Sequence, residues 1–168
     1  MIPDMFNLHK HFTVSLFFIF TVTMLGATSS HAGLYLKPRV GVTTPVKGGD
    51  PYYSLGASAG YQWVRLFGTE VTYTRLVGYG SNSNGNTYRA QGVFTVPVGI
   101  ITPFATAGVG YFDLDTPGYD SQVVTIVGGG ISLSKILFFT ASIGADYIIV
   151  ADDQRDYIEP YIALGVSF

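Results

Sequence analysis

After residue 33, apolar side chains alternate with small or polar ones along most of the chain, which is the two-residue period of a β-strand. Eight stretches follow this pattern and predict eight strands. They cover residues 34–43, 53–63, 70–74, 87–96, 104–112, 122–133, 139–149 and 157–168. No helical period competes with the alternation, and no apolar run after residue 32 is long enough to cross a membrane as a helix.

The connections between these strands alternate in kind. Loops rich in Gly, Pro, Ser, Asn or Asp are expected at residues 44–52, 78–86, 113–121 and 151–156, and tight turns at 64–66, 97–103 and 134–135. An even number of strands, with short turns at one end and longer loops at the other, is typical of outer-membrane barrels. Pro38 and Pro160 cannot donate to a ladder, so we expect a bulge or a water-mediated hydrogen bond where the first and last strands meet.

The first 32 residues predict a cleaved secretory signal peptide. A basic patch that includes Lys10 precedes an apolar stretch at residues 12–25, and the small-residue site Ser30-His31-Ala32 follows. A membrane-anchor helix fits less well, because the apolar stretch is short for a span of roughly 20 residues. Cleavage after Ala32 leaves residues 33–168 as one domain.

Histidine and cysteine are missing from the predicted mature chain. The three histidines, His9, His11 and His31, lie in the predicted leader, and the sequence has no cysteine. A serine hydroxyl is a poor nucleophile without an adjacent base, so histidine-dependent hydrolases are excluded. A Ser–Lys or paired-carboxylate site stays open, but no such pair stands out. We therefore expect no enzyme, no cofactor, no metal and no nucleic-acid partner.

The alternation alone does not say which set of side chains faces inward. A soluble barrel would turn the apolar set inward. The other set, however, is mostly Gly, Ser and Thr, with few of the charges that a water-facing surface carries. The apolar set also carries aromatic residues near the strand ends, as in the girdles of a membrane barrel. Those expected at the loop side are Tyr53, Tyr73, Tyr88, Tyr111 and Tyr147, and those at the turn side are Tyr61, Trp63, Phe139 and Phe168.

With the apolar set outward, the chain predicts an all-β, eight-stranded antiparallel up-and-down transmembrane β-barrel with charged residues in its lumen. We expect one ionic layer of Lys37, Arg39 and Glu70 toward the turns and another of Arg89, Asp146 and Glu159 toward the loops. Eight-stranded interiors are usually just filled by side chains. Bulk between the charges is expected from Phe104, Phe112, Gln62, Gln91 and Gln122, which together with the layers predicts a plugged lumen with a few waters.

The end of the chain resembles the C-terminal assembly signal of bacterial outer-membrane β-barrels. Apolar residues stand at every second position before a terminal Phe168. The resemblance implies that Tyr161, Gly165, Val166 and Phe168 are read by the barrel-assembly machinery. Residues 102–111 and 127–133 resemble the fifth and sixth strands of small opacity-type proteins, which implies a barrel like the membrane domain of outer membrane protein A.

The expected location is the outer membrane, among outer-membrane lipid and lipopolysaccharide. The expected role is structural or surface interaction, like that of an adhesin or surface antigen, with a surface or host partner that the sequence does not name. Two alternatives stay open at this point. One is a narrow porin-like channel for small solutes, and the other is a soluble secreted ligand-binding barrel.

Overall fold

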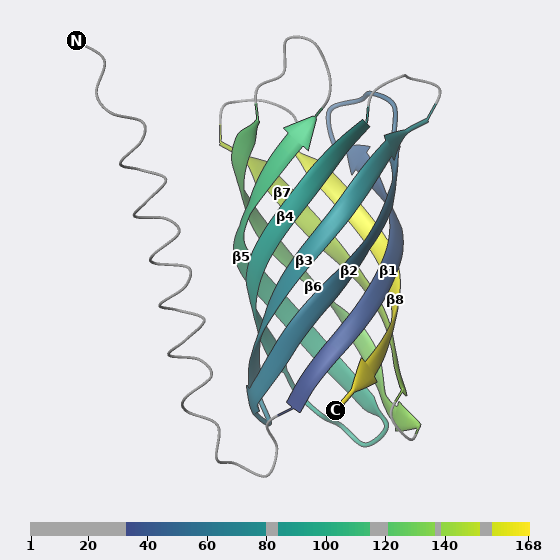
Figure 1. Cartoon of the computed structure of the whole chain (residues 1–168), viewed down its shortest axis with the longest axis vertical. Helices are drawn as coiled ribbons and strands as arrows, with labels where there is room; N and C mark the ends of the chain where they lie inside the picture. The colour runs from purple at the N-terminus through teal and green to yellow at the C-terminus, as the bar shows by residue number, and fades with distance from the viewer. Residues whose placement is uncertain (1–32, 80–83, 115–120, 137–138, 152–155) are drawn as a thin grey trace, which may run out of the picture.

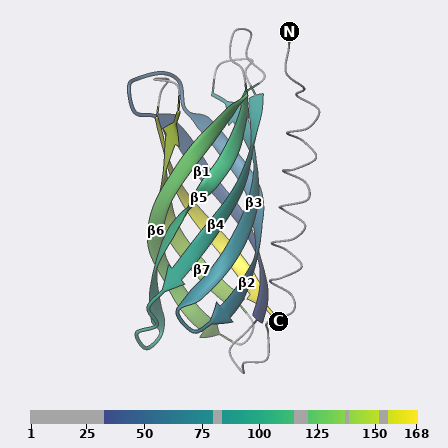
Figure 2. The same cartoon turned by 90° about the vertical axis from the view of Figure 1, so that its left-hand side faces the viewer.

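The computed structural model of the chain describes residues 33–79, 84–114, 121–136, 139–151 and 156–168. The eight strands are β1 (Gly33–Pro45), β2 (Tyr52–Val64), β3 (Phe67–Gly78), β4 (Asn84–Thr95), β5 (Ile101–Leu114), β6 (Gln122–Ile136), β7 (Phe139–Val150) and β8 (Tyr157–Ser167). Each pairs antiparallel with the next, and β8 pairs with β1 to close the barrel (Figures 1 and 2). The predicted fold class is confirmed.

The two ends of the barrel differ in their connections. We call the end with the β2–β3 and β4–β5 connections the turn end, and the end with the β1–β2 connection the loop end. The start of β1 and Phe168 both lie at the turn end (Figure 1). There the backbone N–H of Phe168 donates to the carbonyl oxygen of Leu34 at 2.9 Å. Among the residues that the structure describes, no helix is long and apolar enough to cross a membrane.

The two faces of the strands are sorted as the alternation predicted. Leu55, Ile143 and Leu164 point outward and are 60–64% exposed, whereas Thr74 and Glu159 point inward and are 0% exposed. Successive side chains of a strand point to opposite faces, so this sorting runs along every strand. The barrel therefore has an apolar outer wall and a mixed polar and apolar lumen.

Several strands extend into segments that we expected to be loops or turns. Residues 84–86 belong to β4 and residues 101–103 to β5. The turn expected at 134–135 is wrong, since both residues belong to β6. Asn86 pairs with Asp113, two residue types that favour loops in isolation. Cross-strand pairing has overridden local preference at these positions.

The strands that carry Pro38 and Pro160 keep one register along their whole contact. Pairs on both sides of the prolines, from Tyr35 with Ser167 to Pro45 with Tyr157, are in phase. The paired positions do not include Pro38 or Pro160, which agrees with the missing N–H of proline. Of the two features expected there, the bulge is wrong and the water-mediated hydrogen bond stays a prediction. The register shifts lie instead between Gln62 and Val64 in β2 and between Leu133 and Ile136 in β6.

Gly56 on β2 lies too close to β3 for any side chain. A Cβ atom at this position would meet the carbonyl oxygen of Tyr73 and would lie 2.8 Å from the Cα of Thr74. We expect Gly56→Ala to lower the free energy of unfolding by roughly 1–3 kcal/mol, because the backbone of a closed barrel cannot yield. Urea unfolding of the barrel in detergent micelles, followed by Trp63 fluorescence, measures this.

The matched control is Gly92→Ala on the outer wall. There the nearest atom to an added Cβ is a ring carbon of Phe67 at 3.5 Å, an ordinary contact. The control should change stability by no more than about 0.5 kcal/mol. Equal destabilisation by the two variants would contradict the prediction.

Candidate functional site: the barrel lumen

Four buried charged residues meet near the middle of the lumen, and we call them the ionic cluster. Arg39 Nη2 donates to Asp146 Oδ2 at 2.9 Å and to Glu159 Oε1 at 3.1 Å. Arg89 donates from Nη1 to Asp146 Oδ2 at 2.9 Å and from Nη2 to Glu159 Oε2. All four side chains are at most 3% exposed. Each cation therefore bridges both carboxylates.

The strand register explains why two cations are needed. Asp146 on β7 pairs directly with Glu159 on β8, and two carboxylates facing each other on neighbouring strands repel. Arg39 comes from β1, next to β8, and Arg89 comes from β4. The adjacent strands β7, β8 and β1 and the separate strand β4 thus converge on one neutral cluster. The guanidinium of Arg39 also stacks 3.7 Å from the ring centroid of Tyr161.

A second, weaker ion pair lies closer to the turn end. Lys37 Nζ lies 3.4 Å from Glu70 Oε2, with side chains 22% and 10% exposed, and 4.1 Å from the ring centroid of Tyr35. Thr72 Oγ1 donates to Glu70 Oε1 at 3.2 Å. The expectation that Arg39 belongs with Lys37 and Glu70 is wrong, since Arg39 bonds to the acids of the ionic cluster.

On the other side of the ionic cluster, the loop end of the lumen is filled by apolar side chains. We call this group the apolar plug. It comprises Leu76, Phe112, Leu114, Val124, Ile126, Ile148, Val150 and Tyr157. Leu76, Ile126 and Ile148 are 0% exposed, and the rings of Phe112 and Tyr157 stack with centroids 5.0 Å apart. This end of the lumen contains packed hydrocarbon.

Sequence reasoning placed only Phe112 of this group in the lumen as a filling side chain. For several of the other residues of the apolar plug, the alternation along the sequence did indicate an inward position. The alternation of residues 70–74 continues to Leu76, and that of residues 122–133 already turned Val124 and Ile126 inward. In the run Tyr147-Ile148-Ile149-Val150, both faces are apolar, so alternation of polarity could not assign the inward residues.

A small void lies between the ionic cluster and the Lys37–Glu70 pair. It has a volume of about 20 Å³, and Thr106, Ser142 and Phe104 are among its lining residues. A volume of that size holds about one water molecule. The charged side chains around this void are paired with opposite charges. Within the described residues, no group of three or more His, Cys, Asp or Glu side chains could hold a metal ion.

The residues of the expected assembly signal lie on both faces of β8. Tyr161 and Gly165 point inward, and a Cβ at Gly165 would lie 2.6 Å from Cγ of Lys37. Val166 lies on the outer face, half-buried, and Phe168 is 79% exposed. Their recognition during assembly stays a prediction.

The aromatic residues expected in girdles lie on the outer wall. Tyr73, Tyr88 and Tyr111 are cross-strand neighbours on β3, β4 and β5 and form a continuous row. Exposed side chains of the set also include Tyr53, Tyr147 and Phe139, while Tyr61 and Trp63 are half-buried with ring centroids 4.9 Å apart. Phe67 and Phe94, which were not in the expected set, pair with each other on the outer wall toward the turn end.

No protein-family model matches the chain, and no curated protein matches it either. Solved structures do match. Neisserial surface protein A aligns with a TM-score of 0.66 at 16% identity, over 82% of this chain and 97% of that chain. The N-terminal β-barrel domain of Pseudomonas aeruginosa OprF aligns with a TM-score of 0.62 at 15% identity, over 80% and 97%. Ail, the attachment invasion locus protein of Yersinia pestis, aligns with a TM-score of 0.56 at 12% identity, over 82% and 97%. This chain has the fold of the eight-stranded outer-membrane β-barrels.

In this outer-membrane barrel fold, the ionic cluster should contribute more to stability than the Lys37–Glu70 pair. Glu159→Ala leaves two buried guanidinium groups short of a partner, and breaking a buried pair typically costs roughly 3–5 kcal/mol. Glu70→Ala removes a longer, more exposed contact, so a cost of about 1 kcal/mol or less is expected. Urea unfolding in micelles measures both.

Asp50→Ala, in the exposed β1–β2 connection, is the control and should be neutral. A larger loss of stability for Glu70→Ala than for Glu159→Ala would show that the ionic cluster does not dominate the lumen.

Proposed function

We propose that the protein is an integral outer-membrane barrel with a closed lumen and a structural or surface-interaction role. Residues 1–32, which lie outside the described residues, serve in this proposal as a cleaved signal peptide. The barrel-assembly machinery then inserts the domain among outer-membrane lipid and lipopolysaccharide. The observation that carries the proposal is the sorting of side chains, with Leu55, Ile143 and Leu164 outside and the ionic cluster inside.

The same sorting argues against the soluble secreted barrel. Water-soluble proteins rarely expose apolar patches larger than a few hundred Å². The outer wall of this barrel carries exposed Leu, Ile, Val, Tyr or Phe side chains on every strand. Water around this wall would be costly, whereas acyl chains match it, and a closed sheet leaves no strand edge unpaired in lipid.

The lumen supports a barrel without a permanent pore. The apolar plug, the ionic cluster and the Lys37–Glu70 pair succeed one another along the lumen. The proteins of similar fold include one called a surface protein and one called an attachment invasion locus protein. Those descriptions belong to those proteins, and they motivate the surface-interaction role proposed for this chain. The mature sequence lacks histidine and cysteine, so we propose no catalytic role.

The proposed location and orientation can be tested with epitope insertions in bacterial cells. The pair Gly48 and Gly49, both with positive φ, lies in the exposed β1–β2 connection, where an insertion between them should be tolerated. The protein should fractionate with the outer membrane, and this epitope should be labelled on intact cells. An insertion after Gly99, in the β4–β5 connection, should be labelled only after the outer membrane is permeabilised.

Recovery of the protein in the soluble periplasmic fraction would overturn the proposal. Labelling of the Gly99 insertion on intact cells, but not of the Gly48 insertion, would invert the orientation.

Planar bilayers containing the purified barrel should show no steady conductance. Ions would have to cross the apolar plug and then a cluster in which every charge is paired. In both steps the ion loses bound water, and the lumen supplies no free polar groups to replace that water. Reproducible, ohmic openings of the wild-type barrel would contradict a closed lumen and favour the narrow channel instead.

A further inference from the structure

One oxygen of the buried Asp146 carboxylate has no hydrogen-bond partner among the described residues. The other oxygen, Oδ2, accepts from Arg39 Nη2 and from Arg89 Nη1, both at 2.9 Å. Oδ1 accepts from neither arginine, although the side chain of Asp146 is only 1% exposed. A carboxylate oxygen that loses water on folding and gains no new donor destabilises the folded state, so a partner for Oδ1 is expected.

A donor without a partner belongs to the same ion pair. Arg39 donates from Nη2 to both Asp146 and Glu159, so one nitrogen is shared between two carboxylates. The Nε–H of Arg39 is buried and has no acceptor within the described part of the chain. An arginine and a carboxylate can form two parallel hydrogen bonds, and here one of the two is made. The unused atoms of this pair are Arg39 Nε and Asp146 Oδ1.

Thr106 brings a third atom of this kind to the same region. Its Oγ1 is buried and also lacks a hydrogen-bond partner among the residues that the structure describes. Thr106 on β5 and Asp146 on β7 both pair with Gly128 on β6. A Cβ atom at Gly128 would collide with Asp146 Oδ1 and would lie 2.8 Å from Thr106 Oγ1. The two oxygens therefore face each other across a residue without a side chain. Thr106 and Arg39 also line the small void beside the ionic cluster.

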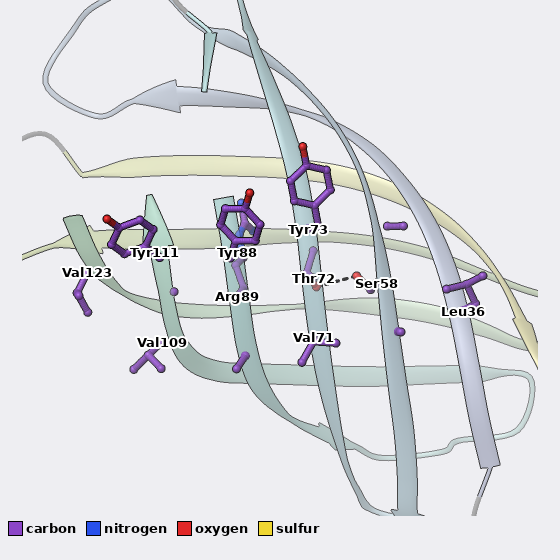
Figure 3. A pocket seen from close by; sticks show the side chains of 14 residues that line it. Leu36, Ser58, Val71, Thr72, Tyr73, Tyr88, Arg89, Val109, Tyr111 and Val123 are labelled. Carbon is purple, nitrogen blue, oxygen red and sulfur yellow. Dashed lines mark hydrogen bonds between the residues drawn. The ribbon is translucent and has the colours of Figure 1, made fainter. Parts of the chain in front are cut away.

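Other hydroxyl groups around this void already have partners. Ser58 Oγ lies 2.8 Å from Thr72 Oγ1, a hydrogen bond drawn as a dashed line in Figure 3. Ser142 Oγ lies 2.9 Å from Ser132 Oγ. These hydroxyl groups therefore need no additional molecule to satisfy them.

We propose that one water molecule binds in the void and bridges Arg39, Asp146 and Thr106. The water accepts a hydrogen bond from Arg39 Nε–H and donates to Asp146 Oδ1 and to Thr106 Oγ1. The void of about 20 Å³ has room for about one water, and three partners are typical of a buried water. A neutral ligand fits better than an ion, because the charges of the ionic cluster already balance. Neither the location nor the conductance of the barrel decides whether this water is bound.

A crystal structure of the refolded barrel, at a resolution that shows ordered water, tests the site. The wild type should contain one water within hydrogen-bond distance of all three atoms. Thr106→Val keeps the shape of the side chain but removes the hydroxyl. It should lose the water and lower the equilibrium constant for folding roughly tenfold, measured by urea unfolding in micelles. Thr106→Ser keeps the hydroxyl and should retain the water.

Thr125→Val is the matched control, because Thr125 lies on the exposed outer face of β6. It should retain the water and should not lower the equilibrium constant for folding. Crystals grown with rubidium bromide should show no anomalous peak at the site, since neither a cation nor an anion is expected there.

Several outcomes would overturn the proposal. They are an anomalous peak at the site, a direct bond from Arg39 Nε to Asp146 Oδ1, a wild-type map without the water, and retention of the water by Thr106→Val. The wild-type and Thr106→Ser structures decide the question if Thr106→Val does not fold.

Discussion

Closure of the sheet on itself is the constraint on which the rest of this structure depends. Pairing of β8 with β1 satisfies the backbone of every strand without an edge, but it also fixes a narrow interior that side chains must fill. Most inward polar groups are then enclosed, and an enclosed charge needs a partner. The ionic cluster meets this demand by neutralising two acids from β7 and β8 with two arginines from β1 and β4.

Inward glycines make room for the large side chains of the lumen. Cβ atoms at Gly60 and at Gly144 would collide with the rings of Tyr35 and Tyr161, respectively. A Cβ at Gly128 would collide with the carboxylate of Asp146. The interior therefore consists of large residues on some strands set against glycines on others. This explains how a glycine-rich set of inward positions accommodates large side chains.

More of the fold than of the candidate site could be predicted from the sequence. Alternation predicted the strand number, but the face of the lumenal charges also needed the scarcity of charge in one set and the aromatic residues near the strand ends in the other. The layer to which Arg39 belongs could not be predicted, because strands in a barrel are tilted and staggered. Residues at equal positions in two different strands therefore lie at different heights along the barrel axis. The apolar plug was missed where both faces of a strand are apolar, as at Ile148 and Val150.

For the closed lumen that we propose, the order of the layers along the lumen indicates where the barrier to solutes would lie. A cluster of paired charges can exchange one partner for another, or for water, at moderate cost when a neighbouring space is polar. Packed hydrocarbon offers a passing ion or water no such partner. The small void lies on the turn-end side of the ionic cluster, and the apolar plug lies on its loop-end side. Changes in the ion pairs alone would leave the apolar plug in place. We therefore propose that hydrocarbon packing at the loop end, more than the salt bridges, keeps the lumen closed.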